Sequence, residues 1–372
     1  MSRGLLVCVS LAVGLTFAGM GFASSISFSV SFDKGDLVFS HLRSYDLVHL
    51  EGCDLVSEPG RPLLPHKPLN ISIPAGSRVM SLRVTSVESV EIDGKYNIYP
   101  AQPDVPISLA RTHQWVQQDE KTYNSRNLFP EAVAELSGQG SFSGHGIARV
   151  LLHPLRYRPA DGELILHTRI EFELDLDHSE RGLRVKVRSP GSERLMSDAV
   201  KSIVINPEAV RNRVAVGSPR LEGDEVEYLI VTSPSHAGRF QRIADWKTKK
   251  GGPAEVITTD SIYAAYPGLD NAEKVRACII DYYTNKGLVW VLLGGDVNVV
   301  PYRGCYGKVG SYIDSNIPCD LYFSDLDGDF NSDKDGIWGE LSDSIDLYPD
   351  VFVGRAPVSS AAECSVVVRK ML

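Results

Sequence analysis

The residues best suited to chemistry lie in an acidic loop between positions 320 and 350. This segment contains nine Asp, Glu340 and a single basic residue, Lys334, so its formal charge equals the −9 of the whole chain. Concentrated carboxylate oxygens are the ligands that hard divalent cations prefer. The chain has no basic stripe, which argues against nucleic acid as its partner.

Oxygen-bearing side chains recur at alternate positions within this loop. Asn331, Asp333 and Asp335, followed by Gly336, match positions one, three, five and six of a calcium-binding loop. Glycine permits the sharp turn that lets such ligands converge. Ser342 stands at position twelve, where a bidentate Glu is expected, so strict EF-hand geometry is not predicted.

We predict a structural Ca²⁺ site here, and a merely solvated acidic loop is the alternative. Calcium is favoured over magnesium because a flexible loop offers many carboxylates. The candidate ligands are Asp325, Asp327, Asp329, Asn331, Asp333, Asp335 and Glu340.

A cysteine–histidine dyad is a second candidate chemistry. His236 follows a predicted strand, and Cys305 and Cys319 follow another, so a thiolate–imidazole pair could form at one sheet edge. However, His236 lies in a Ser-Pro-Ser turn typical of a helix start, and loop cysteines are commonly inert or disulfide-bonded. We therefore assign no dyad, and both a Cys305–Cys319 disulfide and two free thiols remain compatible with the sequence.

The elements that position these residues follow a βαβαβ pattern. Strands are predicted at Tyr228–Thr232, at Glu255–Thr258 and in the run that begins at Leu288, with helices between them. The last run is continuously apolar, which is typical of a strand buried on both faces of a parallel sheet. Sites in such sheets lie beyond the carboxyl ends of the strands.

The chain after this strand is predicted to be irregular until about Leu347. A short strand follows at Val351–Arg355, and a helix begins near Pro357 and continues to Leu372. A sheet of about four parallel strands is small, because such sheets usually contain more strands. We therefore expect further strands of this sheet beyond Leu372.

The N-terminal half has a different pattern. Residues 24–205 alternate mostly with period two, as in Ile26–Phe32, and no long amphipathic helix is expected before Asn206. A turn at Pro159–Gly162 separates two of its predicted strands. We predict an all-β, sandwich-like domain over 24–205.

Two further segments bear on processing. Residues 1–23 contain Arg3, a short apolar run and small residues before a cleavage point after Ala23, which predicts a secretory signal peptide rather than a membrane anchor. No other run could span a bilayer. Residues 206–226 are polar, with Arg211 and Arg220, and are either a plain linker or a linker with a processing site.

Several sequence blocks taken together resemble the gingipain family of cysteine peptidases. In the C-terminal half these blocks are Tyr228–Thr232, Ala244–Lys247, Val291–Asp296, Cys319–Tyr322 and Pro349–Arg355. The blocks that resemble the N-terminal propeptide of that family are Pro59–Pro65, Ile73–Gly76 and Tyr157–Leu164.

The resemblance implies a secreted bacterial zymogen. The propeptide would occupy 24–205, and an incomplete α/β caspase-like domain with a mainly parallel sheet would occupy 227–372. The propeptide would cover the cleft until cleavage in the linker. The family's catalytic Gly-His and Cys lie in the second half of the peptidase domain, so the resemblance places the dyad beyond Leu372 and assigns no catalytic residue here.

Three functions remain open at this stage. The first is part of a peptidase that acts on protein or peptide substrates, with these 372 residues alone inactive. The second is a non-enzymatic, Ca²⁺-dependent surface or adhesion module. The third is a transpeptidase of the same fold family that trims sorting signals.

Overall fold

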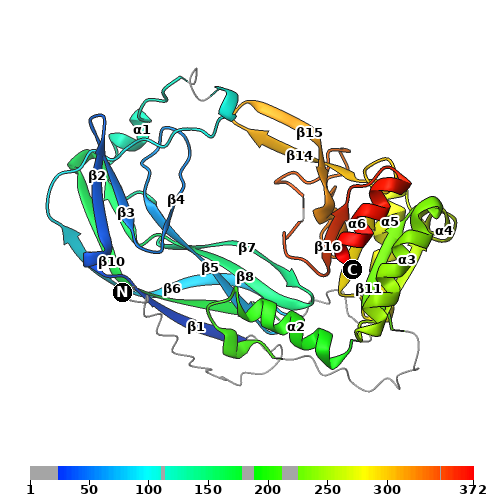
Figure 1. The fold of residues 1–372 in the computed structure, drawn as a ribbon. Helices are drawn as coiled ribbons and strands as arrows, with labels where there is room; N and C mark the ends of the chain where they lie inside the picture. The colour runs from blue at the N-terminus through cyan, green and yellow to red at the C-terminus, as the bar shows by residue number, and fades with distance from the viewer. Residues whose placement is uncertain (1–23, 110–113, 178–187, 212–224, 344) are drawn as a thin grey trace.

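The protein has a β-rich unit followed by an α/β unit (Figure 1). A computed structural model describes residues 24–109, 114–177, 188–211, 225–343 and 345–372. The predicted signal peptide at 1–23 and most of the predicted linker therefore lie outside the described residues. None of the described helices is long and apolar enough to cross a membrane.

The β-rich unit contains two four-stranded sheets and a two-stranded ribbon. One sheet has the order β1-β10-β6, with β9 paired to β10, and the other has the order β4-β5-β8-β7, while β2 and β3 form the ribbon. The strands are β1 Ser24–Ser31, β2 Leu37–Leu42, β3 Tyr45–Leu50, β4 Asp54–Leu55, β5 Pro65–Ile73, β6 Arg78–Ile92, β7 Ala134–Phe142, β8 His145–Leu152, β9 Leu155–Arg158 and β10 Glu163–Asp177.

These two sheets share one hydrophobic core, as predicted for a sandwich. Strand β10 directs Phe172 and Leu174 inward, and Phe172 stacks on Phe28 of β1 with ring centroids 5.4 Å apart. The opposite sheet contributes Ile71 and Val150 to the same core. The period-two pattern therefore placed alternate residues correctly, because successive strand side chains point to opposite faces.

The expectation that no long helix precedes Asn206 is wrong. Helix α2 spans Pro190–Lys201, capped by the Ser189 hydroxyl, which accepts from the Ser192 N–H, with Pro190 at its first position. Its buried Met196 and Val200 pack in a cluster with Val289 of the α/β unit. The cap residue Ser189, Pro190 at the first position and the four-residue spacing of Met196 and Val200 are local signals that could have revealed this helix. A short helix, α1, spans Glu120–Tyr123.

The α/β unit is a four-stranded parallel sheet with helices on both faces, as predicted. Its order is β12-β11-β13-β16, and all three pairings are parallel. One face is covered by α3 and α6, and the other by α4 and α5. The elements are β11 Tyr228–Thr232, α3 Pro234–Lys249, β12 Ala254–Thr258, α4 Thr259–Ala265, α5 Asn271–Lys286, β13 Trp290–Gly294, β16 Phe352–Ala356 and α6 Ala361–Met371.

The segment after β13 is more regular than predicted. Strands β14 (Arg303–Val309) and β15 (Tyr312–Cys319) form an antiparallel hairpin around Gly310, whose φ is +61°. Strand β15 is almost entirely exposed, and β14 alternates in burial only at its start, where Arg303 and Cys305 are buried, so the hairpin lacks the sustained alternation that identifies strands in sequence. The two-residue turn Gly310-Ser311 was the signal that could have revealed this hairpin.

Close packing of α3 on the sheet gives a testable prediction. A Cβ at Gly294 would lie 2.7 Å from the Phe240 ring, whereas a Cβ at Gly354 in the adjacent strand would meet nothing within 4 Å. We expect Gly294→Ala to destabilise the α/β unit by about 1–3 kcal/mol, because overpacking forces a shift in the core. Urea denaturation should show this loss for Gly294→Ala and not for the control Gly354→Ala. Equal midpoints for the two variants would contradict the packing described.

Candidate functional site

The carboxyl edge of the parallel sheet is held by one arginine. Arg355, at the end of β16, donates two hydrogen bonds to the carboxylate of Asp320, at 2.7 and 2.8 Å. Its Nη1 also donates to the carbonyl oxygen of Val300, at 2.7 Å. The bidentate pair and the carbonyl contact fix the loop that leaves β13, because the guanidinium fork has one preferred orientation.

His236 and the two cysteines lie in different surroundings. His236 is buried in the first turn of α3, and its Nδ1 lies 3.0 Å from the Ser233 hydroxyl. It lines a polar cavity of about 580 Å³ with Ser233, Ser235, Thr259, Tyr263, Asn271, Asn298, Val299, Ser359 and Ala361. Neither cysteine lines this cavity, so the structure gives no support for a dyad built from these residues.

Cys305 and Cys319 are neighbours on the β14–β15 hairpin, with both sulfurs present as free thiols. A hydrogen bond between them lowers the pKa of Cys319 to about 6 and raises that of Cys305. The pairing of β14 with β15 therefore brings together two residues that are far apart in the loop sequence.

The acidic loop contains an inner group of carboxylates, formed by Asp325, Asp327 and Asp350. One oxygen of each lies within 4.8 Å of the others. Asp325 is 0% exposed and Asp350 is 1% exposed, whereas Asp327 is exposed to solvent. The Oδ1 of Asp325 accepts from the Gly328 N–H at 2.7 Å, but its buried Oδ2 has no hydrogen-bond partner among the described residues. The backbone N–H groups of Asp346 and Leu347 lie near this carboxylate and partly offset the rise in its pKa, but neither makes a hydrogen bond of normal geometry to Oδ2, and a bound ion would satisfy it.

An outer group is formed by Asp333, Asp335 and Glu340, whose ligand oxygens also lie within 4.8 Å of one another. Asp333 and Asp335 are exposed, and clusters of exposed acidic residues are common at places where no ion binds. The remaining predicted ligands serve the loop itself. Asp329 Oδ1 accepts from the Asn331 N–H, and Asn331 Oδ1 accepts from the Gly336 N–H, both at 3.1 Å.

The structure thus divides five of the seven predicted ligands between two groups and adds Asp350, which the calcium-loop spacing did not include. Asp350 lies far from Asp325 in sequence, just before β16. The only signal for it was its place in the block Pro349–Arg355, which fits the end of a long loop returning to the sheet.

Burial changes the proton affinity of this region. Desolvation, with the charge of Asp325 as a smaller cause, raises the pKa of Asp327 to about 6 and that of Asp346 to about 7. The same causes, with Asp327 as the main charge, raise the pKa of Asp350 well above its ordinary value. The Arg276 guanidinium lowers the pKa of Asp325 and Asp327 only in part, so positive charge near these carboxylates does not balance their burial.

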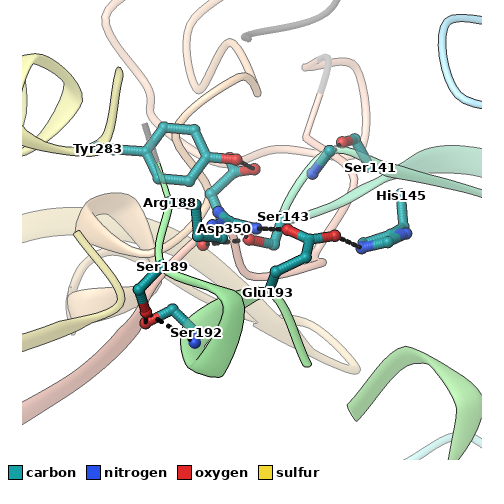
Figure 2. Close-up of polar contacts among 10 residues, drawn as sticks. Ser141, Ser143, His145, Arg188, Ser189, Ser192, Glu193, Tyr283 and Asp350 are labelled. Atoms are coloured by element: carbon teal, nitrogen blue, oxygen red, sulfur yellow. Dashed lines mark hydrogen bonds and ion pairs between the residues drawn. The ribbon is translucent and has the colours of Figure 1, made fainter. Parts of the chain in front are cut away.

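The β-rich unit contacts this same loop through the β7–β8 hairpin (Figure 2). The Ser141 N–H donates to Asp346 Oδ2 at 2.6 Å, and the Ser143 hydroxyl donates to the Asp350 carbonyl oxygen at 3.0 Å. Phe142, between them, packs edge-to-face on Phe352 of β16 with centroids 6.2 Å apart. The tip of the hairpin is therefore seated on the α/β unit.

A buried polar network extends from this contact (Figure 2). Arg188 donates to the Ser143 hydroxyl at 2.8 Å and pairs with Glu193 of α2 at 3.3 Å. Glu193 lies 3.6 Å from His145 Nε2, and the Arg188 guanidinium lies over the ring of Tyr283 on α5. The network ties α2 and the hairpin to one face of the α/β unit.

Comparisons with known proteins divide the chain in the same way. The family model for the propeptide of peptidase family C25 matches residues 22–214, and the model for peptidase family C25 matches residues 222–372. Two curated relatives are Lys-gingipain HG66 and Lys-gingipain W83 of Porphyromonas gingivalis, each 23% identical over 357 residues and 92% of this chain. The chain spans about a fifth of the length of these relatives, 19% and 18%.

Two solved structures are also similar. The complex of the Porphyromonas gingivalis RgpB pro- and mature domains matches with 22% identity, 53% of this chain, 97% of that chain and a TM-score of 0.41. The structure of zymogenic gingipain K from the same organism matches with 18% identity, 45% of this chain, 98% of that chain and a TM-score of 0.37. Because the propeptide model alone covers more than half of its residues, the chain belongs to the gingipain family, peptidase family C25.

Proposed function

We propose that this chain is the N-terminal portion of a secreted cysteine endopeptidase zymogen. The observation that carries the proposal is the match of a C25 propeptide and a C25 peptidase region, in that order, on one chain. The contacts of the β7–β8 hairpin with the acidic loop support it, because a propeptide must bind the domain that it keeps latent.

The chemistry of the complete protein would be attack of a cysteine thiolate on a peptide carbonyl, with histidine as the base. We assign neither group to residues 1–372. The described residues would supply the sheet, its helices and the Arg355–Asp320 pair that fixes the loop at the carboxyl edge. Residues 1–23 would direct secretion as a signal peptide.

The absence of an assigned dyad gives a prediction about activity. The purified chain of 372 residues should show no turnover of fluorogenic peptide amides in the presence of a thiol reductant. An active cysteine peptidase in the same buffer is the control, and thiol-dependent turnover by the chain would contradict the assignment.

The coding DNA beyond the Leu372 codon tests the proposal itself. We expect it to continue through a strand ending in Gly-His and a second strand leading to Cys. A stop codon directly after Leu372 would overturn the peptidase proposal. A non-enzymatic, cation-dependent surface module would then be the better explanation of the β-rich unit and acidic loop.

We also propose a structural Ca²⁺ at the inner group. Asp325, Asp327 and Asp350 would hold it, because their oxygens converge and Asp325 Oδ2 has no other partner among the described residues. Hard oxygen ligands suit Ca²⁺, which would cross-link the two ends of the acidic loop. The outer group is exposed and has no such orphaned oxygen, so we expect it to bind a cation more weakly.

Calcium titration should separate the two groups. We expect Asp327→Asn to weaken Ca²⁺ binding by about tenfold or more, since it removes one charge from the ligand set. The matched control is Asp333→Asn in the outer group, which should leave the tighter binding step unchanged. Isothermal calorimetry of the full chain measures both. If Asp333→Asn abolishes the tight step and Asp327→Asn does not, the inner group is the wrong site.

The raised pKa of Asp346 predicts how stability depends on pH when no cation is present. A carboxyl whose pKa is about 7 in the folded chain binds its proton more strongly there than in the unfolded chain. Its stabilising contribution is present below about pH 4 and is lost as the pH rises through 7.

The isosteric variant Asp346→Asn removes this dependence. In EDTA, its melting temperature relative to the natural chain should increase as the pH rises from 4 to 7.5. Thermal melts followed by circular dichroism measure the difference. A difference that does not change with pH would show that Asp346 titrates normally.

A further inference from the structure

We propose that cation binding and propeptide docking are coupled, so that a divalent cation at the inner group strengthens the seating of the β7–β8 hairpin on the peptidase region. The inference rests on the proposed cation site. It adds a regulatory consequence, namely that removal of the cation loosens the propeptide.

The β7–β8 hairpin contacts the acidic loop directly, so a change in the position of the loop would change these contacts. Its Ser141 N–H and Ser143 hydroxyl donate to Asp346 and to the Asp350 carbonyl oxygen. Gly140 is equally important, because a Cβ at this position would overlap both the Cβ and the carboxylate of Asp346. A side chain of any size at 140 would therefore push the loop and the hairpin apart.

Asp350 links the hairpin to the cation ligands. Its carboxylate accepts from the Tyr283 hydroxyl at 3.2 Å and from the Leu326 N–H at 2.9 Å, so its side chain is fixed beside Asp325. Its carbonyl oxygen meets Ser143 of the hairpin. A change in the position of Asp350 therefore reaches both the cation site and the docking contact.

Charge gives the direction of the coupling. Docking covers the acidic loop with a surface that offers it a backbone N–H and a hydroxyl. Among the described residues, no ion pair reaches Asp325, Asp327, Asp346 or Asp350. The nearest guanidiniums bond elsewhere, since Arg188 contacts Ser143 and Glu193, and Arg276 contacts backbone carbonyl oxygens.

Arg276 is the nearby cation, but it forms no ion pair with these carboxylates, and burying several carboxylates with so little counter-charge is unfavourable. If the hairpin separated from the acidic loop, water could solvate these carboxylates. A bound divalent cation would neutralise them while the hairpin stays docked. The cation should therefore favour the docked state. By thermodynamic linkage, docking must then strengthen cation binding by the same factor.

The first test is hydrogen exchange of the full chain in Ca²⁺ and in EGTA. We expect amides of residues 139–146 to exchange faster in EGTA, while those of the β9–β10 hairpin, buried in the sandwich core, remain unchanged. Equal exchange at 139–146 in the two conditions would overturn the coupling.

The second test reads the linkage from the opposite side. Gly140→Ala should raise the Kd for Ca²⁺ by about fivefold or more, although residue 140 contributes no cation ligand. The matched control is Gly138→Ala on the same strand, where a Cβ would meet nothing within 4 Å, and its Kd should not change. Ser143→Ala is a second variant that should weaken docking. It removes the hydroxyl contact with Asp350 and adds no atom that could clash.

The outcomes separate this inference from the cation site itself. If the natural chain shows no calcium-binding heat, the proposed site is wrong and the coupling falls with it. If the chain binds Ca²⁺ but Gly140→Ala and Ser143→Ala bind it as tightly as Gly138→Ala does, the site stands and the coupling is refuted.

Discussion

The burial of clustered carboxylates where the two units meet constrains the rest of this structure. Asp325 and Asp350 have almost no exposure, and Asp327 and Asp346 lie beside them. Like charges in a low dielectric repel strongly, so each group must either take up a proton or face a cation. The raised pKa values of Asp327 and Asp346 correspond to uptake of a proton. The convergent oxygens of Asp325, Asp327 and Asp350 would allow a cation to bind instead.

The topology of the parallel sheet determines where these carboxylates lie. Strand β13 ends at Gly294, and its neighbour β16 begins only after the chain has formed the β14–β15 hairpin and the acidic loop. Because β13 and β16 are parallel, the excursion leaves the sheet at the carboxyl edge beside Gly294 and returns at the opposite edge, where Phe352 pairs with Trp290. Arg355 holds the part at the carboxyl edge, by pairing with Asp320 and the Val300 carbonyl. Asp350, which precedes β16, therefore lies at the amino edge of the sheet, and Asp325 and Asp327 converge on it there.

Local patterns predicted the elements but not the contacts between them. The apolar run of β13 and the cap-to-glycine span of α5 are local signals, and both were placed correctly. Helix α2 carried local signals too, in Ser189, Pro190 and the spacing of Met196 and Val200, but its packing against Val289 could not be read from them. Asp350 was missed as a ligand because its position beside Asp325 follows from the pairing of β16 with β13, which no local pattern shows.

The contact between the two units combines a small apolar cluster with several polar contacts. Its apolar part, where Phe142 and Met196 cluster with Val289 and Tyr348, is small beside the sandwich core, and polar groups surround it. An interface dominated by apolar burial resists separation, whereas polar groups regain water when two units separate. The two units also meet at the β14–β15 turn. There Gly310 lies beside the backbone carbonyl oxygen of Asp104, a polar group of the β-rich unit. The network of Arg188, Glu193 and Ser143 thus gives this contact a specific fit without the large apolar area of a permanent interface.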